Sequence, residues 1–408
     1  MNAGNPSGSP LDSSYSWFRL SIALLAGTIG SIGMWTVVVV LPTVQAEFGT
    51  PRADASLPFT FTMMGFALGN VVMGWLADRF GIVRPIMVGA MLLAAGYVSA
   101  GLSPNLWIFA SAHFLIGLGV SSTFGPLIAD TSHWFWRRRG IAVAVVASGN
   151  YLAGTVWPIA TQKVMMAYGW RPTHIAIGIF CICTIVPLSL LLRRRLSAHD
   201  EAAATTRAAD ARADIGISLT ALHALLSIAA FMCCVAMAIP QVHIVAYCGD
   251  LGYGVARGAE MLTLMLGFGV ISRIASGFVA DKFGGLPTLL MGSVMQAVAM
   301  AMYFSFDGLT SLYIISILFG LFQGGIVPSY AIIVREYFPP KEAAVRVGVV
   351  IAISVFGMAL GGWSAGWIFD LTASYRAAFA VGFGANLLNI AIAVWLLLRL
   401  PKPQMAHA

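Results

Sequence analysis

Long apolar runs follow one another along almost the whole of this chain. About 20 apolar residues span the hydrocarbon core of a bilayer, and twelve runs of about that length can be counted. Only 10% of the residues are charged, against roughly 25% in soluble proteins. Because backbone polar groups inside a bilayer must pair with one another, we predict an all-α membrane protein with twelve transmembrane helices. The predicted spans are about 18–44, 56–77, 85–102, 106–129, 140–162, 173–192, 218–246, 258–280, 286–306, 310–334, 345–369 and 375–398.

A charged turn between two apolar runs occurs twice in the sequence. Both copies read G-x-x-x-D-(R/K)-x-G, and the second follows the first by 203 residues, about half the chain. The first copy comprises Gly74, Asp78, Arg79 and Gly81, with Arg84 just beyond it, and the second comprises Gly277, Asp281, Lys282 and Gly284. Gly117 and Gly320 are separated by the same interval. Internal repeats of this kind are typical of secondary transporters, so we expect two pseudo-symmetric six-helix halves.

Polar stretches mark the limits of these halves. The first residues are rich in Gly, Pro and Ser and lack the basic start of a signal peptide. The middle of the chain contains three consecutive arginines and then few large apolar residues, which is typical of a flexible linker. The expected parts are a disordered cytoplasmic tail at 1–16, a first half at 17–192, a cytoplasmic linker at 193–217, a second half at 218–400 and a cytoplasmic tail at 401–408.

Lys and Arg are distributed unequally between the two sides of the predicted membrane. Of the 23 cations, 17 fall on the side of the two termini and five on the other side, which leaves Arg273 inside a span. An excess of Lys and Arg marks the cytoplasmic side of a membrane protein. We therefore expect a multi-pass protein of the cell (inner or plasma) membrane with both termini in the cytoplasm.

Arg273 is the one cation predicted near the middle of the bilayer. It precedes Asp281 by eight residues, which is roughly 12 Å along a helix. None of the 16 acidic residues is expected at that depth. A charge there costs several kcal/mol unless it faces water, a partner or a ligand, and a planar guanidinium can hold a carboxylate through two parallel hydrogen bonds. We interpret Arg273 as an anion-binding residue; the alternative is a packing role through backbone carbonyls.

The repeated charged turns resemble the loop signature of the major facilitator superfamily, where it lies between helices 2 and 3 and again between helices 8 and 9. Twelve helices in two halves match that family too, so the resemblance covers nearly the whole chain and implies the major facilitator fold. It also implies that the two turns act as conformational latches, which form in one state and break in another. The alternative is that Arg79 and Arg84 only enforce topology.

A second resemblance is to monocarboxylate transporters and oxalate/formate-exchanger-like proteins. The stretch 134–142, running into 147–150, is similar to the start of their fifth helix. Those families also carry an arginine four residues before the glycine of the second charged turn, where Arg273 stands here. The resemblance implies that Arg273 binds the substrate carboxylate.

The sequence departs from those families at other positions. Gly269 stands where the animal monocarboxylate transporters carry an acidic residue, and their first-helix signature is missing. Neither the first nor the eleventh predicted helix has a lysine in its interior. With one central cation, a monocarboxylate, or a larger acid with one anionic group, is favoured over a dicarboxylate held at both ends.

Other polar and aromatic residues are weaker candidates. In this superfamily helices 1, 4, 7 and 10 usually line the cavity, with 2, 5, 8 and 11 beside them. We therefore add Trp35, Asn150, Tyr151 and Gln323 as substrate-binding candidates, although aromatic residues in helices more often serve packing. His113 lies four residues before Gly117 and can change charge near neutral pH. It is our candidate for proton coupling; the alternative is a hydrogen-bonded histidine with no such role.

Several classes of function are not indicated. There is no catalytic pattern and no phosphate-binding G-x-x-x-x-G-K-(S/T), so we expect neither an enzyme nor an ATP-driven pump. The five cysteines fall in or beside apolar runs and are interpreted as core residues rather than disulfides or metal ligands. No cofactor, metal or nucleic acid is expected, since the net charge of +7 lies in short loops. We expect a monomer in a lipid bilayer.

The observations favour a secondary active transporter of a small organic anion of the monocarboxylate type. Its substrate would cross by alternating access, as proton symport or anion exchange. The alternative is a proton-driven exporter of drugs or amphipathic metabolites, although no buried carboxylate is predicted to drive it. A non-transporting membrane sensor is a third class, and the absence of a recognisable signalling domain argues against it.

Overall fold

The computed structural model describes residues 11–135, 139–194, 217–338 and 340–399. All regular elements within these ranges are α-helices, and twelve helical segments are long and apolar enough to cross a membrane. The helices are α1 (Ser14–Gly30), α2 (Ile32–Phe48), α3 (Arg52–Phe80), α4 (Val83–Gly101), α5 (Leu106–Ser121), α6 (Gly125–Trp134), α7 (Arg139–Ala147), α8 (Gly149–Tyr168), α9 (Trp170–Leu191), α11 (Leu219–Asp250), α12 (Val255–Phe283), α13 (Gly285–Ser305), α14 (Leu309–Gln323), α15 (Ile326–Tyr337), α16 (Pro340–Thr372) and α17 (Tyr375–Arg399). The predicted all-α membrane fold is confirmed.

The structure changes one expected boundary of the chain and does not describe two of the expected segments in full. Ser13 caps α1, which begins at Ser14, so the last residues of the expected tail 1–16 belong to the first helix. The helix starts this early because the Ser13 hydroxyl accepts a hydrogen bond from the N–H of Ser16 and so caps the first turn. Most of the expected linker, 195–216, and the C-terminal tail from residue 400 lie outside the described residues.

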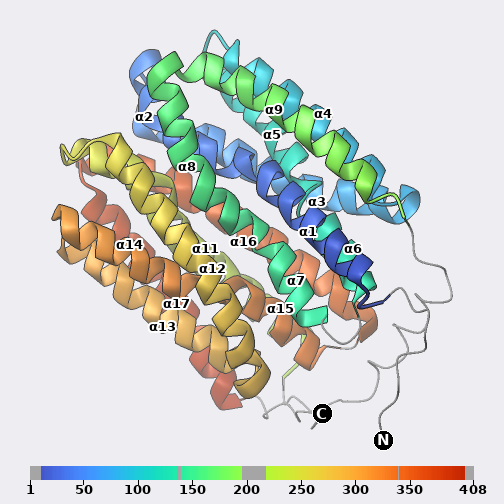
Figure 1. Cartoon of the computed structure of the whole chain (residues 1–408). Coiled ribbons are helices and arrows are strands. Elements are labelled where there is room, and N and C mark those ends of the chain that lie inside the picture. The colour runs from blue at the N-terminus through green and yellow to red at the C-terminus, as the bar shows by residue number, and fades with distance from the viewer. Residues whose placement is uncertain (1–10, 136–138, 195–216, 339, 400–408) are drawn as a thin grey trace, which may run out of the picture.

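The helices form two bundles, α1–α9 and α11–α17, that lie against each other (Figure 1). The bundles meet where α8 packs along α12 and where α3 packs along α16. We call the end that holds residues 49–52 and 370–375 the Arg52 end, and the opposite end, which holds both glycine turns, the charged-turn end. The sequence prediction places the Arg52 end outside the cell.

The two halves repeat the same close contacts at the same sequence interval. A β-carbon added at Gly117 would lie 2.1 Å from the carbonyl oxygen of Thr62, and one added at Gly320 would lie 2.0 Å from that of Met265. Thr62 and Met265 are themselves 203 residues apart. Glycine lets these helix backbones approach in lipid. The repeated contact therefore supports the predicted pseudo-symmetry.

Four of the membrane spans contain a break in the helix. The breaks fall at Ser31, at 122–124, at Ser148 and at 324–325. The second and fourth occupy equivalent places in the two halves. A break leaves backbone carbonyls without their usual partners in the next turn, and inside a membrane such groups are tolerated where protein or a water-filled cavity meets them.

Candidate substrate-binding site

Arg273 lies on α12 between the two halves of the molecule. Its Nη1 donates to the carbonyl oxygen of Ala147 at 2.9 Å, and its Nε donates to that of Gly324 at 3.3 Å. Ala147 ends α7 in the first half, and Gly324 lies in the break between α14 and α15 in the second. The helix breaks therefore supply the acceptors for this guanidinium.

An aromatic ring completes the surroundings of Arg273. The guanidinium carbon lies 4.2 Å from the ring centroid of Tyr151, which is buried on α8. A cation over a ring face is stabilised by the ring's quadrupole. Backbone carbonyls and an aromatic ring face thus stabilise the charge of Arg273, as the alternative of a packing role predicts. A guanidinium has five N–H groups, so these two hydrogen bonds leave others available to a ligand.

Trp35 and Asn150 form a second part of the same site. The indole Nε1 of Trp35 donates to Asn150 Oδ1 at 3.1 Å and to its backbone oxygen at 3.0 Å. Asn150 directly precedes Tyr151, and a β-carbon at Gly154 would meet Trp35 and Leu266. Side chains from α2, α8 and α12 therefore make one continuous cluster that contains four of the five predicted substrate-binding residues.

Gln323, the fifth candidate, lies at the end of α14 beside the same helix break. Its Oε1 accepts from Gln241 Nε2 on α11 at 2.9 Å, and both side chains are buried. The remaining amide atoms, Gln241 Oε1 and Gln323 Nε2, have no hydrogen-bond partner among the residues that the structure describes. Gln241 was not singled out from the sequence, although a glutamine within an apolar run is a recognisable signal.

His113 lies away from this cluster. It is buried on α5, donates from Nδ1 to the carbonyl oxygen of Phe109 at 2.9 Å and has its ring centroid 6.0 Å from that of His174 on α9. Both helices belong to the first half, so His113 packs inside that half and not between the halves. Its role in proton coupling stays a prediction.

The charged turns have the backbone expected of them, but their acidic side chains lie outside the described residues. Gly81 and Gly284 adopt φ of 79° and 86°, which favours glycine. Among the described residues, nothing lies within 4 Å of a β-carbon added at Gly74 or Gly277, so neither glycine marks a close helix contact there. The latch function of Asp78 and Asp281 stays a prediction.

The basic residues of these turns lie against neighbouring aromatic rings. Arg79 and Arg84 have their guanidinium carbons 5.7 and 5.1 Å from the Phe80 ring, and Lys282 Nζ lies 5.4 Å from the Phe283 ring. These cations therefore contact residues of their own turns. Whether they also latch the two halves stays a prediction.

A second contact between the halves, at the Arg52 end, was missed by sequence reasoning. The Arg52 guanidinium donates to Asp250 on α11 at 3.1 Å and to the Tyr375 hydroxyl on α17 at 3.0 Å. Asp370 on α16 accepts the backbone N–H groups of Arg52 and Ala53, both at 2.7 Å, and so caps α3. The first residue of α3 therefore joins three helices of the other half.

A buried histidine extends this contact. The Tyr375 hydroxyl accepts from Arg52 and so has its own hydrogen free to donate to His243 Nδ1, 2.9 Å away. His243 Nε2 lies 2.7 Å from the Gly362 carbonyl, which can only accept. A neutral ring with its proton on Nε2 satisfies both partners.

Comparison with known proteins identifies the family. A sequence model of the Major Facilitator Superfamily matches residues 23–312 and 226–408. Monocarboxylate transporter 13 of Bos taurus is 26% identical over 93% of this chain and 88% of its own length. The Agnestins efflux protein AgnL12 of Paecilomyces divaricatus is 23% identical over 70% of this chain and 65% of its own.

Solved structures show the same fold. A bacterial homologue of the human lysosomal transporter Spinster, in an inward-facing and occupied conformation, matches with a TM-score of 0.69 at 15% identity, covering 95% of this chain and 96% of that one. Together with the twelve membrane-length helices, these matches show a multi-pass membrane transporter and not an enzyme. The chain belongs to the Major Facilitator Superfamily.

Proposed function

We propose that this protein is a secondary active transporter of a small organic anion with one carboxylate, which Arg273 binds during alternating access. The observation that carries the proposal is the guanidinium between the halves, held by two backbone carbonyls and the face of Tyr151. A carboxylate holds a guanidinium more strongly than neutral carbonyl dipoles do, because it carries a full negative charge and can accept two parallel hydrogen bonds. An arriving carboxylate therefore competes well for Arg273.

The same exchange of partners would couple binding to movement. The bond from Arg273 to Ala147 ties α12 of the second half to α7 of the first. A substrate carboxylate that takes the N–H group of this bond releases the tie, so occupied and empty transporters differ in how firmly the halves are joined. Differential contact of this kind is what a ligand needs in order to shift a conformational equilibrium.

Supporting residues surround the proposed anion site. Trp35, Tyr151 and the amides of Asn150 and Gln323 would contact the remainder of the substrate. Transport would proceed as proton symport or as anion exchange, with His113 as the proposed proton-coupling residue. The charge asymmetry supports a cell-membrane protein with both termini cytoplasmic.

An exporter of drugs or amphipathic metabolites is the second candidate function. The aromatic side chains of Trp35 and Tyr151 beside Arg273 favour it, and one relative is named an efflux protein. Such a protein would bind its substrate mainly through aromatic contact, and loss of the guanidinium would matter little.

Flux through purified protein tests the proposal. We expect protein in liposomes to take up a subset of radiolabelled monocarboxylates, and Arg273→Ala to abolish that uptake. Arg257→Ala is the matched control, because Arg257 is exposed on the same helix and forms an ion pair with Glu260, one turn away, on the surface. Full uptake by the Arg273 variant, or transport of amphipathic cations in place of acids, would contradict the proposal and favour the exporter.

A further inference from the structure

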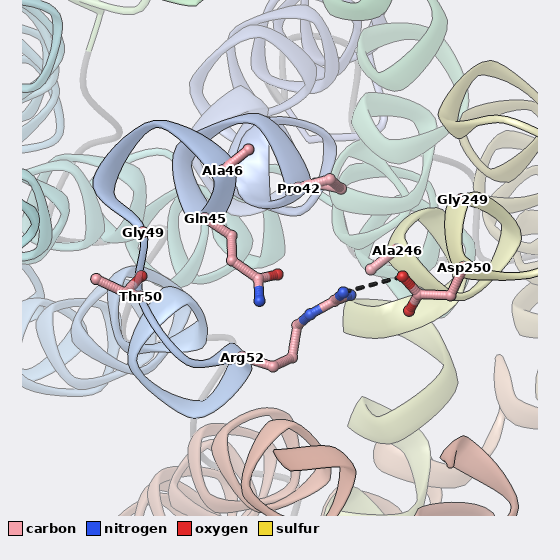
Figure 2. A pocket seen from close by; sticks show the side chains of 9 residues that line it. All are labelled: Pro42, Gln45, Ala46, Gly49, Thr50, Arg52, Ala246, Gly249 and Asp250. Atoms are coloured by element: carbon pink, nitrogen blue, oxygen red, sulfur yellow. Dashed lines mark hydrogen bonds and ion pairs between the residues drawn. The ribbon is translucent and has the colours of Figure 1, made fainter. Parts of the chain in front are cut away.

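A cavity separates the halves at the Arg52 end. Its volume is about 430 Å³, and its lining comes from α2, the turn before α3, and the end of α11. We call it the vestibule. Gln45, Thr50, Arg52 and Asp250 are among its lining residues, and Figure 2 shows the Gln45 amide and the Arg52 guanidinium extending into the same space. Small-molecule sites have volumes in this range, roughly 300–1,000 Å³.

Arg52, one of the residues that line this cavity, has an unused donor. The residue is buried, with a relative exposure of 6%, and its Nε has no hydrogen-bond partner among the described residues. Nη1 donates to Tyr375 and Nη2 to Asp250. Nε and Nη2 form one edge of the guanidinium, and carboxylates bind such an edge through two parallel hydrogen bonds. Asp250 therefore bonds to only one of the two nitrogens of an edge that suits a whole carboxylate.

A further unpartnered polar group lines the vestibule. The Thr50 hydroxyl is buried and has no hydrogen-bond partner within the part of the chain that the structure describes. An unsatisfied buried donor costs free energy that a ligand or water can recover. The vestibule thus combines a half-used cationic edge with a free hydroxyl, which is the composition of a polar ligand site.

We propose that the vestibule is a second binding site for a carboxylate, distinct from the site at Arg273, and that the carboxylate displaces Asp250 from the Nε–Nη2 edge of Arg52. Asp250 can leave because its side chain is 35% exposed and is able to turn toward water. Tyr375 keeps Nη1 occupied during the exchange, and Asp370 keeps its bonds to the backbone of α3.

Displacement of Asp250 would break one of the ties that close the Arg52 end. The pair Arg52–Asp250 joins α3 of the first half to α11 of the second. An anion that arrives at this end would weaken the closed arrangement before it reaches Arg273. This consequence for transport depends on the proposed function, whereas binding in the vestibule does not.

The two members of the ion pair should respond in opposite directions, which separates a binding site from a structural salt bridge. Arg52→Gln removes the cationic edge and should abolish vestibule binding. Asp250→Asn removes the competing carboxylate and should tighten binding about tenfold. A salt bridge with only a structural role is broken equally by both substitutions, so the two variants would then behave alike.

The test is equilibrium binding of radiolabelled benzoate and acetate to full-length protein in lipid nanodiscs, with benzamide as the uncharged competitor. All variants are made in the Arg273→Ala background, so that only vestibule binding is measured. Arg376→Gln and Asp307→Asn are matched controls, because this Arg–Asp pair lies at the same end with a distance of 2.9 Å and is exposed on both sides. We expect saturable binding that benzamide does not displace and that the control substitutions leave unchanged.

Each outcome has a defined meaning. Loss of binding in Arg52→Gln together with tighter binding in Asp250→Asn supports the vestibule site. Binding that changes equally in both variants, or in neither, overturns it. The single variant Arg52→Gln, with Arg273 intact, is the control for folding and should keep Arg273-dependent binding. If it does not, Arg52→Lys replaces Arg52→Gln in the test. Lysine keeps the charge but lacks the two-nitrogen edge, so we expect this variant to lose vestibule binding as well.

Failure of the vestibule site and failure of the proposed function can be told apart. Binding that depends on Arg273 but not on Arg52 overturns the vestibule site alone. Binding that depends on Arg52, combined with flux that does not require Arg273, overturns the proposed function alone. A lack of probe binding by the unmodified protein and by every variant overturns both.

Discussion

Two charged residues show how this protein stabilises cations between its halves. Arg273 and Arg52 both lie between the halves, but the first is held by carbonyls and a ring and the second by a carboxylate and a hydroxyl. A carboxylate partner compensates the charge itself, while carbonyls only solvate it. Arg273 is therefore the more open of the two to an incoming anion.

The shape of the guanidinium should matter as much as its charge at position 273. We expect Arg273→Lys to weaken carboxylate binding at least about tenfold, roughly 1.4 kcal/mol, because an ammonium cannot make two parallel bonds to one carboxylate. Thermal-shift titration with the best monocarboxylate from the flux assay measures the change. Affinity equal to that of the unmodified protein would show that Arg273 acts only as a point charge.

Glu336 provides a pH-dependent contribution to stability at the charged-turn end. It follows the tenth membrane span and accepts the N–H of Gly285, the first residue of α13, at 2.9 Å. Burial raises the pKa of this carboxyl, and the bond from Gly285 opposes the rise. Because the folded state favours the protonated form, the stabilisation is present at low pH and is lost as the pH rises through the raised pKa.

Replacing Glu336 by a residue that does not titrate should flatten the dependence of protein stability on pH. We expect Glu336→Gln to be as stable as the unmodified protein in acid and more stable at neutral pH, since the amide oxygen still accepts from Gly285 without carrying a charge. Thermal unfolding in detergent from acid to neutral pH checks this, with Asp307→Asn, whose side chain is exposed, as the surface control. Parallel pH profiles for the Glu336 variant and the unmodified protein would contradict it.

At the scale of helices, close glycine contacts and helix breaks determine which groups meet. Gly117 and Gly320 bring α5 onto α3 and α14 onto α12, and the spans that contain them break one helical turn further on. The close approach of α14 to α12 places the Gly324 carbonyl beside Arg273. Packing and the binding site are therefore linked through the same pair of helices.

A methyl group at such a contact should be costly. We expect Gly320→Ala to destabilise the protein by about 1–3 kcal/mol or more, because its β-carbon would lie 2.0 Å from the Met265 carbonyl oxygen and the helices must separate. Gly384→Ala is the matched control, since nothing lies within 4 Å of its β-carbon in α17. Thermal unfolding of both variants measures the difference in stability. Equal melting temperatures would mean that the α12–α14 contact is not rigid.

At the scale of the whole molecule, two of the sets of contacts between the halves bear on movement. One is at the Arg52 end, where α3 meets α11, α16 and α17, and the other is around Arg273, where α12 meets α7 and α8. The proposed alternating access requires the first set to open while the protein stays folded. The rigid packing within each half, through repeated glycine contacts, suits movement of the halves as bodies.

A covalent link across the Arg52 end should stop transport. A β-carbon at Gly366 would lie 2.9 Å from Ser56 Oγ, and a disulfide needs about 3 Å between the β-carbon of one residue and the sulfur of the other. With the five native cysteines replaced by alanine, oxidation of the double variant Ser56→Cys, Gly366→Cys should abolish uptake, and reduction should restore it.

A second disulfide within one half serves as the control. A β-carbon at Gly101 would lie 2.8 Å from Ile175 Cγ1, and both glycine sites have a carbonyl oxygen at the same 2.8 Å, so the local strain is matched. The cross-linked Gly101→Cys, Ile175→Cys variant should transport normally. Full uptake by the oxidised Ser56–Gly366 pair would show that α3 and α16 do not separate during transport.

The sequence alone determined the membrane fold and its two halves. These properties depend on apolar length and on a repeat at a fixed interval, both of which can be counted in one dimension. The structure bears this out in the paired contacts of Gly117 with Thr62 and Gly320 with Met265, which keep the interval of the repeat.

Only the tertiary structure decided what the key side chains contact. The acceptors of Arg273 are backbone carbonyls exposed by helix breaks, and such groups carry no side-chain signature. The sequence indicated which helix carries His113, but not the direction in which its side chain points. In the structure the ring faces His174 on α9. In the sequence Arg52 has the position of a cation in a short loop. The fold places Asp250 and Asp370 of the other half against it. Contacts between residues hundreds of positions apart depend on how helices rotate and pack, and that information is not contained in the pattern of any single segment.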